Sequence, residues 1–510
     1  MRDTTPILVG AAQYVDRDKP VLGKSLSPAD IASLVARTAL KDCNTQQNVA
    51  DIIDVLAVAR LFEHSVKERV MWPNPFGCSN NMPGSVARRL GIKPSRLVYS
   101  EVGGETPQRL VNQMAEAIYH NEVRGALITG AEALATIKSA QRSGLEFDWC
   151  EQISDDFEDL WPDKPMCSDY ENRHGVNIPI QVYALLEQVK RAQLGLKTKE
   201  YREAVGALFA AFTGVAANNP FAQFPIARSA EEIATVSSDN FLLAEPYTKW
   251  MVAQDAVNQG AAIVMTSVGM AEELSIPESN WVYLTAYADA DELMVSERPQ
   301  LAMSEAQGEA LKYVIETANL TPEDIDFMDL YSCFPIAVTS TCEHLGIETQ
   351  RPRSLTVTGG LPFFGGPGNN YSLHAIAEIV WRLRGQSKVD ALIVANGGYL
   401  SKHSIGAYSR SAPARWSPSS FRPATSKNKK VPLIESPCGE GVIESYSAMY
   451  KKNNPSGGFI FGRLTESDER FIAVLKSGDN QALNILFEEQ PIGRKVSVSH
   501  EGGINNFSAV

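Results

Sequence analysis

A glycine-rich segment, TVTGGLPFFGGPGNN at residues 356–370, is the part of the chain best suited to hold a ligand. Its glycines permit close backbone approach and left-handed conformations. Asn369, Asn370 and Ser372 offer capping oxygens to a helix whose apolar residues follow at helical spacing. Because a helix N-terminus favours anionic or carbonyl oxygen, the segment predicts a ligand-binding loop. A purely structural turn is the equal alternative.

Two reactive side chains follow an expected strand in MDLYSCFPIAV, residues 328–338. The phenol of Tyr331 can donate a hydrogen bond to a developing oxyanion, or act as a base if its pKa is lowered. Cys333 is two residues farther along and could face the same side of the strand as a nucleophile. The alternatives are a packed tyrosine whose hydroxyl bonds backbone, and a buried inert thiol.

Two further sites for proton transfer are visible. His403 follows a turn that begins at Asn396 and could reach back as a proton carrier, or lie on the surface. The pair Gly103 and Gly104 stands beside Glu105 at an expected strand-to-helix turn. Glu105 could act as a general base if desolvated, and helix capping explains it equally well.

Several segments occur in the order found in thiolases of the sterol-carrier-protein class, and the chain resembles that family over residues 6–410. Besides the glycine-rich segment they are ILVGAAQY, RSAEEIATVSSDNFLLAEPYTKWMVAQDAVNQGAAIVMTS, MDLYSCFPIAV and ALIVANGGYLSKHSIGAYS. The tail resembles the additional C-terminal domain of thiolase-like proteins of type 1, which is similar to an oligonucleotide/oligosaccharide-binding (OB) barrel.

The resemblance implies that the usual thiolase reaction is lost. Thiolases form a thioester on a cysteine at a helix N-terminus, where a lowered pKa and the helix N–H groups assist it. No cysteine lies between Cys78 and Cys150, so the resemblance implies that this nucleophile is absent, and by helix register Gly104 occupies its place. Gly366 and Tyr331 stand where the family carries histidines, and the loop at Asn396 has neither cysteine nor histidine.

The resemblance therefore implies two classes of function. One is an enzyme that acts on an acyl-CoA without an acyl-enzyme, by analogy with thiolase-like aldolases that carry a tyrosine at the position of Tyr331. The other is a non-catalytic acyl-CoA or lipid binder, or a scaffold. Acetyl-CoA acetyltransferase is the superfamily's usual activity. Coenzyme A is expected only as part of the substrate, without a permanently bound cofactor or a metal.

The candidate residues fall into two groups. The catalytic candidates are Tyr331, His403 and Cys333. The residues expected to bind substrate or coenzyme A are Gly103, Gly104, Gly366, Asn369, Asn370 and Asn396.

The expected fold is α/β, a thiolase fold of two similar αβ halves in αβαβα layers, with a helical loop domain and a small all-β, OB-like C-terminal domain. The expected parts are an N-terminal half at 1–270 with its loop domain at about 138–238, a C-terminal half at 271–412, a linker at 413–430 and the β domain at 431–510. In the family, the loop domain covers the acyl pocket.

Local patterns predict the elements that position these residues. Helices are expected at 27–41, at 83–90, from Thr106 as N-cap, at 304–318 and again from the TPED sequence at 321–324. The intervening strands are continuous apolar runs, which predicts a sheet that is mainly parallel and covered on both faces.

Composition limits the classes of partner that the protein can be expected to bind. The net charge of −13 disfavours nucleic acid or an anionic membrane, because both need clustered Lys and Arg. The seven scattered cysteines form no C-x-x-C pair, which predicts reduced thiols and no structural zinc. No export signal and no long apolar stretch is visible. We therefore expect a cytoplasmic monomer or homodimer that acts on a small molecule.

Overall fold

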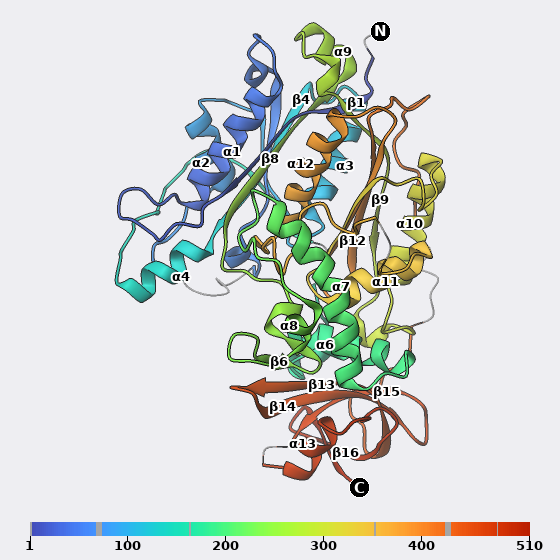
Figure 1. Cartoon of the computed structure of the whole chain (residues 1–510). Helices are drawn as coiled ribbons and strands as arrows, with labels where there is room; N and C mark the ends of the chain where they lie inside the picture. The colour runs from blue at the N-terminus through green and yellow to red at the C-terminus, as the bar shows by residue number, and fades with distance from the viewer. Residues whose placement is uncertain (1–2, 68–73, 163–164, 351–352, 424–429, 477) are drawn as a thin grey trace.

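The computed structural model describes residues 3–67, 74–162, 165–350, 353–423, 430–476 and 478–510. Residues 424–429 of the expected linker thus lie outside the described residues. The described chain forms a ten-stranded sheet with helices on both faces and a seven-stranded sheet that includes the C-terminal region (Figure 1).

The N-terminal half supplies six strands of the larger sheet. They are β1 (Pro6–Val15), β2 (Ile53–Val58), β3 (Arg96–Tyr99), β4 (Gly125–Ala133), β5 (Glu158–Asp159) and β8 (Asn258–Ser267). β2 pairs parallel with β3 and β4, but β8 runs antiparallel to β1 and β4. The prediction of a mainly parallel sheet is therefore wrong at its centre, because apolar runs indicate helices on both faces and not strand direction.

The C-terminal half supplies the other four strands. They are β9 (Val282–Asp291), β10 (Phe327–Leu330), β11 (Asp390–Gly397) and β12 (Lys402–Ser409). β10 and β11 are parallel, whereas β11 with β12 and β12 with β9 are antiparallel. The two halves join where β1 pairs with β9, through Ile7 opposite Tyr283 and Leu8 opposite Val282.

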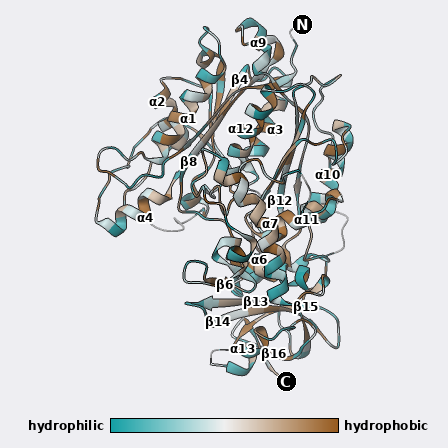
Figure 2. Cartoon of the chain, in the orientation of Figure 1, coloured by the Kyte–Doolittle hydropathy of each residue, from teal (hydrophilic) through white to brown (hydrophobic). Residues whose placement is uncertain are grey.

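Helices complete the layers. One outer face is covered by α1 (Pro28–Asp42), α2 (Met82–Leu90) and α9 (Val268–Glu273). Between the halves lie α3 (Thr106–Tyr119) and α12 (Tyr371–Arg384). The other outer face is covered by α10 (Glu305–Ala318) and α11 (Pro335–Leu345). This is the αβαβα order that the sequence predicts. Figure 2 shows hydrophobic residues along the strands that these helices cover.

A mostly helical region separates β4 from β8. It contains α4 (Leu134–Ser143), α5 (Asp169–Arg173), α6 (Pro179–Gln193), α7 (Thr198–Asn218) and α8 (Ala230–Ala234), followed by β6 (Leu242–Ala244) and β7 (Tyr247–Thr248). α6 and α7 lie between the larger sheet and the C-terminal region in Figure 1.

The C-terminal region is a small barrel with one helix. Its elements are β13 (Gly439–Lys451), β14 (Asn454–Leu464), β15 (Arg470–Leu475), α13 (Asn480–Leu486), β16 (Lys495–Glu501) and β17 (Ile504–Ala509). The strands pair in a closed ring, β13–β14–β15–β17–β16 and back to β13. The expected C-terminal β region is present, and it also contains the helix α13. β6 and β7 extend this sheet, since Ala244 pairs with Met449.

Three expected helix starts differ in detail. The N-cap of α3 is Glu105 and not Thr106, and it makes no side-chain cap bond. α12 begins without a side-chain cap, so Asn370 does not cap it. The TPED sequence forms a turn in which the Thr321 amide donates to Asp324 Oδ2 at 2.9 Å. No helix follows this turn, because β10 begins three residues later.

No helix in the described ranges is long and apolar enough to cross a membrane.

Candidate functional site

The turn before α3 meets the segment after β10 where the sequence placed the missing cysteine. The hydroxyl of Tyr331 fills the space in front of Gly104. A Cβ atom on Gly104 would overlap that hydroxyl and lie 2.7 Å from the carbonyl oxygen of Asn396. Gly104, Tyr331 and Asn396 therefore lie together, although they come from distant parts of the chain.

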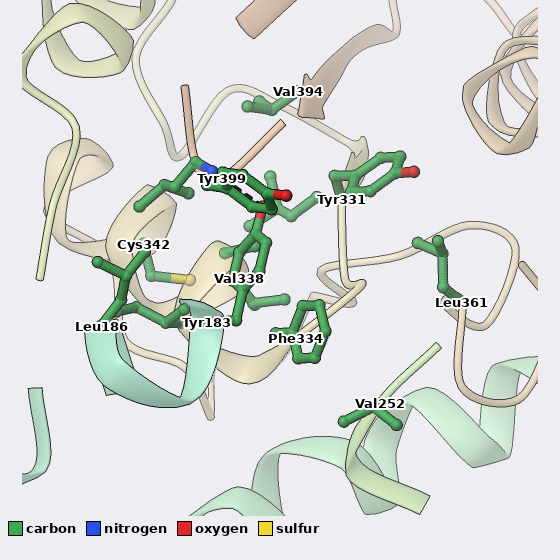
Figure 3. Close-up of a cluster of buried hydrophobic side chains, with 14 of the residues drawn as sticks. Tyr183, Leu186, Val252, Tyr331, Phe334, Val338, Cys342, Leu361, Val394 and Tyr399 are labelled. Carbon is green, nitrogen blue, oxygen red and sulfur yellow. Dashed lines mark hydrogen bonds between the residues drawn. The ribbon is translucent and has the colours of Figure 1, made fainter. Parts of the chain in front are cut away.

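Tyr331 is held as a neutral phenol. It is 7% exposed, and its ring packs edge-on against Tyr371 with centroids 5.4 Å apart. Its hydroxyl makes no hydrogen bond within the described part of the chain, and in Figure 3 it points away from Tyr183. Burial first, then Cys333 and Glu105, raise the pKa of Tyr331 well above its ordinary value. The group can therefore donate a hydrogen bond but is a poor base at neutral pH.

Cys333 lies in a hydrogen-bond network with Asn396 and Tyr183, and its burial keeps the thiol protonated. Asn396 Nδ2 approaches the Cys333 sulfur at 3.7 Å and donates to the Tyr183 hydroxyl at 2.9 Å. Burial raises the pKa of Cys333 to about 12, so a reactive thiolate is not present at neutral pH. β10 ends before Tyr331, so strand alternation does not decide where Cys333 points.

Tyr183 is a site residue that sequence reasoning missed, because its helix was interpreted as core packing. From α6 its hydroxyl donates to Gly398 O at 3.1 Å and accepts from the Leu400 amide at 2.9 Å. Its ring stacks on Phe334 with centroids 4.2 Å apart. This tyrosine thus ties the helical region to the loop between β11 and β12. Figure 3 shows Tyr183 near Phe334.

Glu105 is enclosed directly behind the glycine turn. It has no exposed surface, and neither carboxyl oxygen has a hydrogen-bond partner in the described ranges. Both oxygens lie against Gly103, and one also lies against Gly397. Burial raises the pKa of Glu105, partly offset by Lys402 and Arg109. Of the two explanations given by the sequence, capping is wrong, since the side chain makes no cap bond.

The glycine-rich segment reaches this turn through its asparagines. Asn369 Oδ1 accepts from the Gly103 amide at 3.1 Å, and Ser372 Oγ donates to Gly104 O at 2.6 Å. Asn370 points elsewhere, since its amide donates to Gly130 O at 2.8 Å in β4. The structure therefore brings Gly103, Gly104 and Asn369 together and directs Asn370 into the first half of the sheet.

Gly366 is linked to the site through the backbone of Ala253 and Gln254. Its amide donates to Gln254 O at 2.8 Å, and the neighbouring Ala253 amide donates to Cys333 O at 3.0 Å. An added Cβ on Gly366 would meet nothing closer than 3.4 Å. This position therefore has room for a side chain, in contrast to Gly104.

His403 is fixed in β12 opposite Asn396 and does not reach back from a surface loop. It has no exposed surface, and neither ring nitrogen has a hydrogen-bond partner among the residues that the structure covers. Burial, with Arg298 nearby, lowers the pKa of His403 to about 3. The imidazole is therefore neutral at physiological pH.

Two cavities lie apart from this cluster. One of about 400 Å³ opens between α7, residues 354–356 and α12. Another of about 470 Å³ lies between the start of α7 and the C-terminal barrel. None of the candidate catalytic residues lines either cavity.

The layered fold, with a glycine turn, a tyrosine and an asparagine meeting at a helix N-terminus, defines a thiolase-like protein. Residues 423–503 match the family described as the thiolase-like protein type 1 additional C-terminal domain. A monomeric SCP2-thiolase like protein type 1 from Mycobacterium smegmatis, known from its crystal structure, is 36% identical, covers 100% of both chains and superposes with a TM-score of 0.83. The chain belongs to the SCP2-thiolase-like protein type 1 family.

More distant relatives share the fold. An acetyl-CoA acetyltransferase from Methanothermobacter thermautotrophicus is 26% identical over 235 residues, which is 43% of this chain and 58% of that protein. The match therefore spans less than two thirds of that relative's length. The Ltp2-ChsH2(DUF35) aldolase structure superposes with a TM-score of 0.56 at 18% identity, over 80% of this chain and 99% of that one. At that identity the likeness concerns the fold alone.

Proposed function

We propose that this protein binds acyl-CoA thioesters at the junction of Gly104, Tyr331 and Asn396 and acts on them without forming an acyl-enzyme. The observation that carries the proposal is the Tyr331 hydroxyl, which lies in front of Gly104 and has no hydrogen-bond partner among the described residues. A neutral phenol at that point can donate to the carbonyl oxygen of a thioester. The protonated Cys333 is not a replacement nucleophile.

The reaction that fits a hydrogen-bond donor without a nucleophile is cleavage of a carbon–carbon bond. In a retro-aldol step on a β-hydroxyacyl thioester, a base takes the hydroxyl proton, the Cα–Cβ bond breaks, and its electron pair forms the thioester enolate. Tyr331 stabilises the enolate oxygen, and protonation of Cα then gives a shortened acyl-CoA and a carbonyl compound. The name of the acetyl-CoA acetyltransferase relative supports the acyl-CoA substrate.

Glu105 is our candidate for the base. It interacts electrostatically with Tyr331, and its raised pKa makes it a stronger base once ionised. Because the carboxyl group lies behind Gly103 and Gly397, the proton would reach it past the glycine turn.

A specific observation favours the second candidate, a non-catalytic acyl-CoA binder. Glu105 and His403 both have zero exposure, so neither proton carrier has a surface open to a substrate. On this alternative, the glycine turn and Tyr331 hold the thioester but no bond changes.

The test compares the natural chain with Tyr331→Phe, which keeps the ring and removes only the hydroxyl. We expect coenzyme A to bind both proteins, measured by calorimetry, and cleavage of β-hydroxyacyl-CoA to fall about 100-fold in the variant, as for other lost oxyanion donors. Mass spectrometry of the protein after incubation should show no acyl adduct. If coenzyme A binds equally to both proteins and neither cleaves the thioester, only the non-catalytic binder remains. If coenzyme A binds to neither protein, both functions are rejected.

We further propose that the protein works as a monomer in the cytoplasm, with coenzyme A only as part of the substrate. The relative from Mycobacterium smegmatis, described as monomeric, supports the first point. Light scattering of the purified chain tests it.

A further inference from the structure

Three side chains with metal-binding atoms meet in the region that follows β2, outside the acyl-CoA site. Glu63 and His64 end a short 3-10 helix (Phe62–His64), and Cys78 precedes α2. One ligand atom from each of the three lies within 4.8 Å of the others. His64 Nε2 is 3.2 Å from Cys78 Sγ and 4.0 Å from Glu63 Oε1.

These separations suit one tetrahedral ion. With bonds of about 2.3 Å to sulfur and about 2.0 Å to nitrogen or oxygen, tetrahedral geometry separates the ligand atoms by about 3.3–3.6 Å. The observed 3.2 and 4.0 Å lie on either side of that range. All three separations are within 4.8 Å, so side-chain rotations that adjust them would bring His64, Cys78 and Glu63 into coordination.

The histidine is already oriented for this role. Its Nδ1 lies 2.8 Å from the hydroxyl of Tyr99, which also accepts the Leu61 amide at 3.0 Å. Tyr99 is 4% exposed and so is itself held in place. A hydrogen bond at Nδ1 is the usual way in which proteins fix the ring of a metal-binding histidine. It leaves Nε2 of His64 facing Cys78.

The carboxylate supplies a second, independent observation. Glu63 is only 3% exposed, and its Oε2 has no hydrogen-bond partner among the residues that the structure describes. A buried carboxyl oxygen without a partner is costly, and a bound cation would satisfy it. The His64 side chain is 21% exposed, so an ion can enter from solvent.

We propose that Glu63, His64 and Cys78 bind a divalent cation of the zinc class, with a solvent molecule in the fourth position. A thiolate, an imidazole and a carboxylate favour zinc over magnesium or calcium, which prefer oxygen ligands alone. The set is not a C-x-x-C pair, because His64 and Cys78 are separated by 14 positions.

The site adjoins the acyl-CoA site. Ser65 follows His64 directly, and its hydroxyl accepts from the Asn369 side-chain amide at 3.2 Å. The other end of that side chain accepts from Gly103. A bound ion would thus stabilise the loop that supports the glycine turn.

The experiment uses the full chain after treatment with a chelator, titrated with Zn²⁺ by calorimetry and with Co²⁺ by absorption spectroscopy. We expect one ion per chain, an intense visible spectrum of tetrahedral Co²⁺ and a thiolate-to-cobalt charge-transfer band. Cys78→Ser should abolish that band. Glu63→Gln and His64→Gln should weaken binding at least tenfold, and Tyr99→Phe about 10- to 100-fold through orientation of His64.

Matched controls are Cys150→Ser, which removes an exposed thiol next to Gly77, and Cys438→Ser, which removes an exposed thiol far away. Both should bind Co²⁺ as the natural chain does. A pale octahedral spectrum without the charge-transfer band, no binding at all, or an equal loss in Cys150→Ser would overturn the assignment. Far-ultraviolet circular dichroism of each variant, compared with the chelator-treated natural chain, separates lost ligands from lost folding.

Discussion

The hydroxyl of Tyr331 stands where a side chain on Gly104 would begin. The space in front of this helix N-terminus is therefore filled from another part of the chain. A side chain at position 104 would need room made at Tyr331 as well.

Gly104→Cys should destabilise the protein. Its new Cβ would meet both the Tyr331 phenol and the Asn396 carbonyl oxygen, and overpacking of this kind costs about 1–3 kcal/mol. Gly104→Cys should cost less stability in a Tyr331→Ala protein than in the natural chain. Only the contact of the new Cβ with the Asn396 carbonyl oxygen then remains. Thermal and urea unfolding measure both effects.

Gly366→Ala is the control for this pair. Its Cβ would meet nothing nearer than 3.4 Å, so Gly366→Ala should cost clearly less stability than Gly104→Cys. If Gly104→Cys is tolerated as well as Gly366→Ala, the Tyr331 hydroxyl does not occupy the position found here.

Sequence reasoning predicted the fold well because it depends on many weak signals in order. The glycine-rich segment, the strand before Tyr331 and the hairpin that carries Asn396 and His403 each mark one element of the layers. Errors arose where a local pattern has two outcomes. The TPED sequence at 321–324 satisfies its own polar groups as a turn just as it would at a helix start.

The site could be predicted only in part, because its contacts join residues far apart in the sequence. The bond from Gly103 to Asn369 spans 266 positions, and no local pattern specifies it. The sequence also did not predict which side chains are buried. His403 was expected to reach back from a turn or lie on the surface, but it is enclosed in β12. Tyr183 was missed because a tyrosine on an amphipathic helix is ordinarily core.

Glu132 should make the protein less stable as pH rises. Its carboxyl accepts the Phe62 amide at 2.7 Å, but burial raises its pKa to about 8 from an ordinary 4.5. A raised carboxyl pKa gives stability that is complete below the ordinary value and is lost as pH rises through the folded value. In Glu132→Gln the fall between these values should lessen by up to about 1.4 kcal/mol per pH unit.

Urea unfolding of both proteins at several pH values measures this slope. Glu151 is the control of opposite sign, because the Arg89 side chain lowers its pKa. Glu151→Gln should therefore remove stability that the natural chain holds at neutral pH and loses in acid. Parallel curves for the natural chain and Glu132→Gln would contradict the assigned burial.

His403 should contribute to acid lability. Its folded pKa of about 3 lies below the ordinary 6.5, so the stability present above 6.5 is lost as pH falls toward 3. His403→Leu removes two ring nitrogens that have no hydrogen-bond partner in the described ranges, and it should flatten that part of the curve. In nuclear magnetic resonance spectra of the natural protein, the His403 ring should stay neutral down to about pH 4, well below an unperturbed imidazole. Titration of that ring near its ordinary value would show that solvent reaches it.

Arg470 should hold the C-terminal barrel to the rest of the molecule. It has no exposed surface, and it forms two bonds of 2.7 Å to Glu444 while its Nη1 donates to Ser296 O at 2.8 Å and Arg298 O at 2.6 Å. Arg470→Met would leave the buried carbonyls without a donor and weaken the hold on Glu444. Removing one partner of a buried ion pair costs about 3–5 kcal/mol.

Arg463 provides the matched control, because it binds the same Glu444 at 2.9 and 3.1 Å with a side chain that is 25% exposed. Arg463→Met should cost no more than about 1 kcal/mol. Hydrogen exchange of the amides in β13 and β15 reports the barrel by itself, and protection there should fall far more in Arg470→Met. Equal losses in the two variants would mean that the barrel depends on Glu444 pairing alone, and that the contacts of Arg470 with Ser296 and Arg298 do not anchor it.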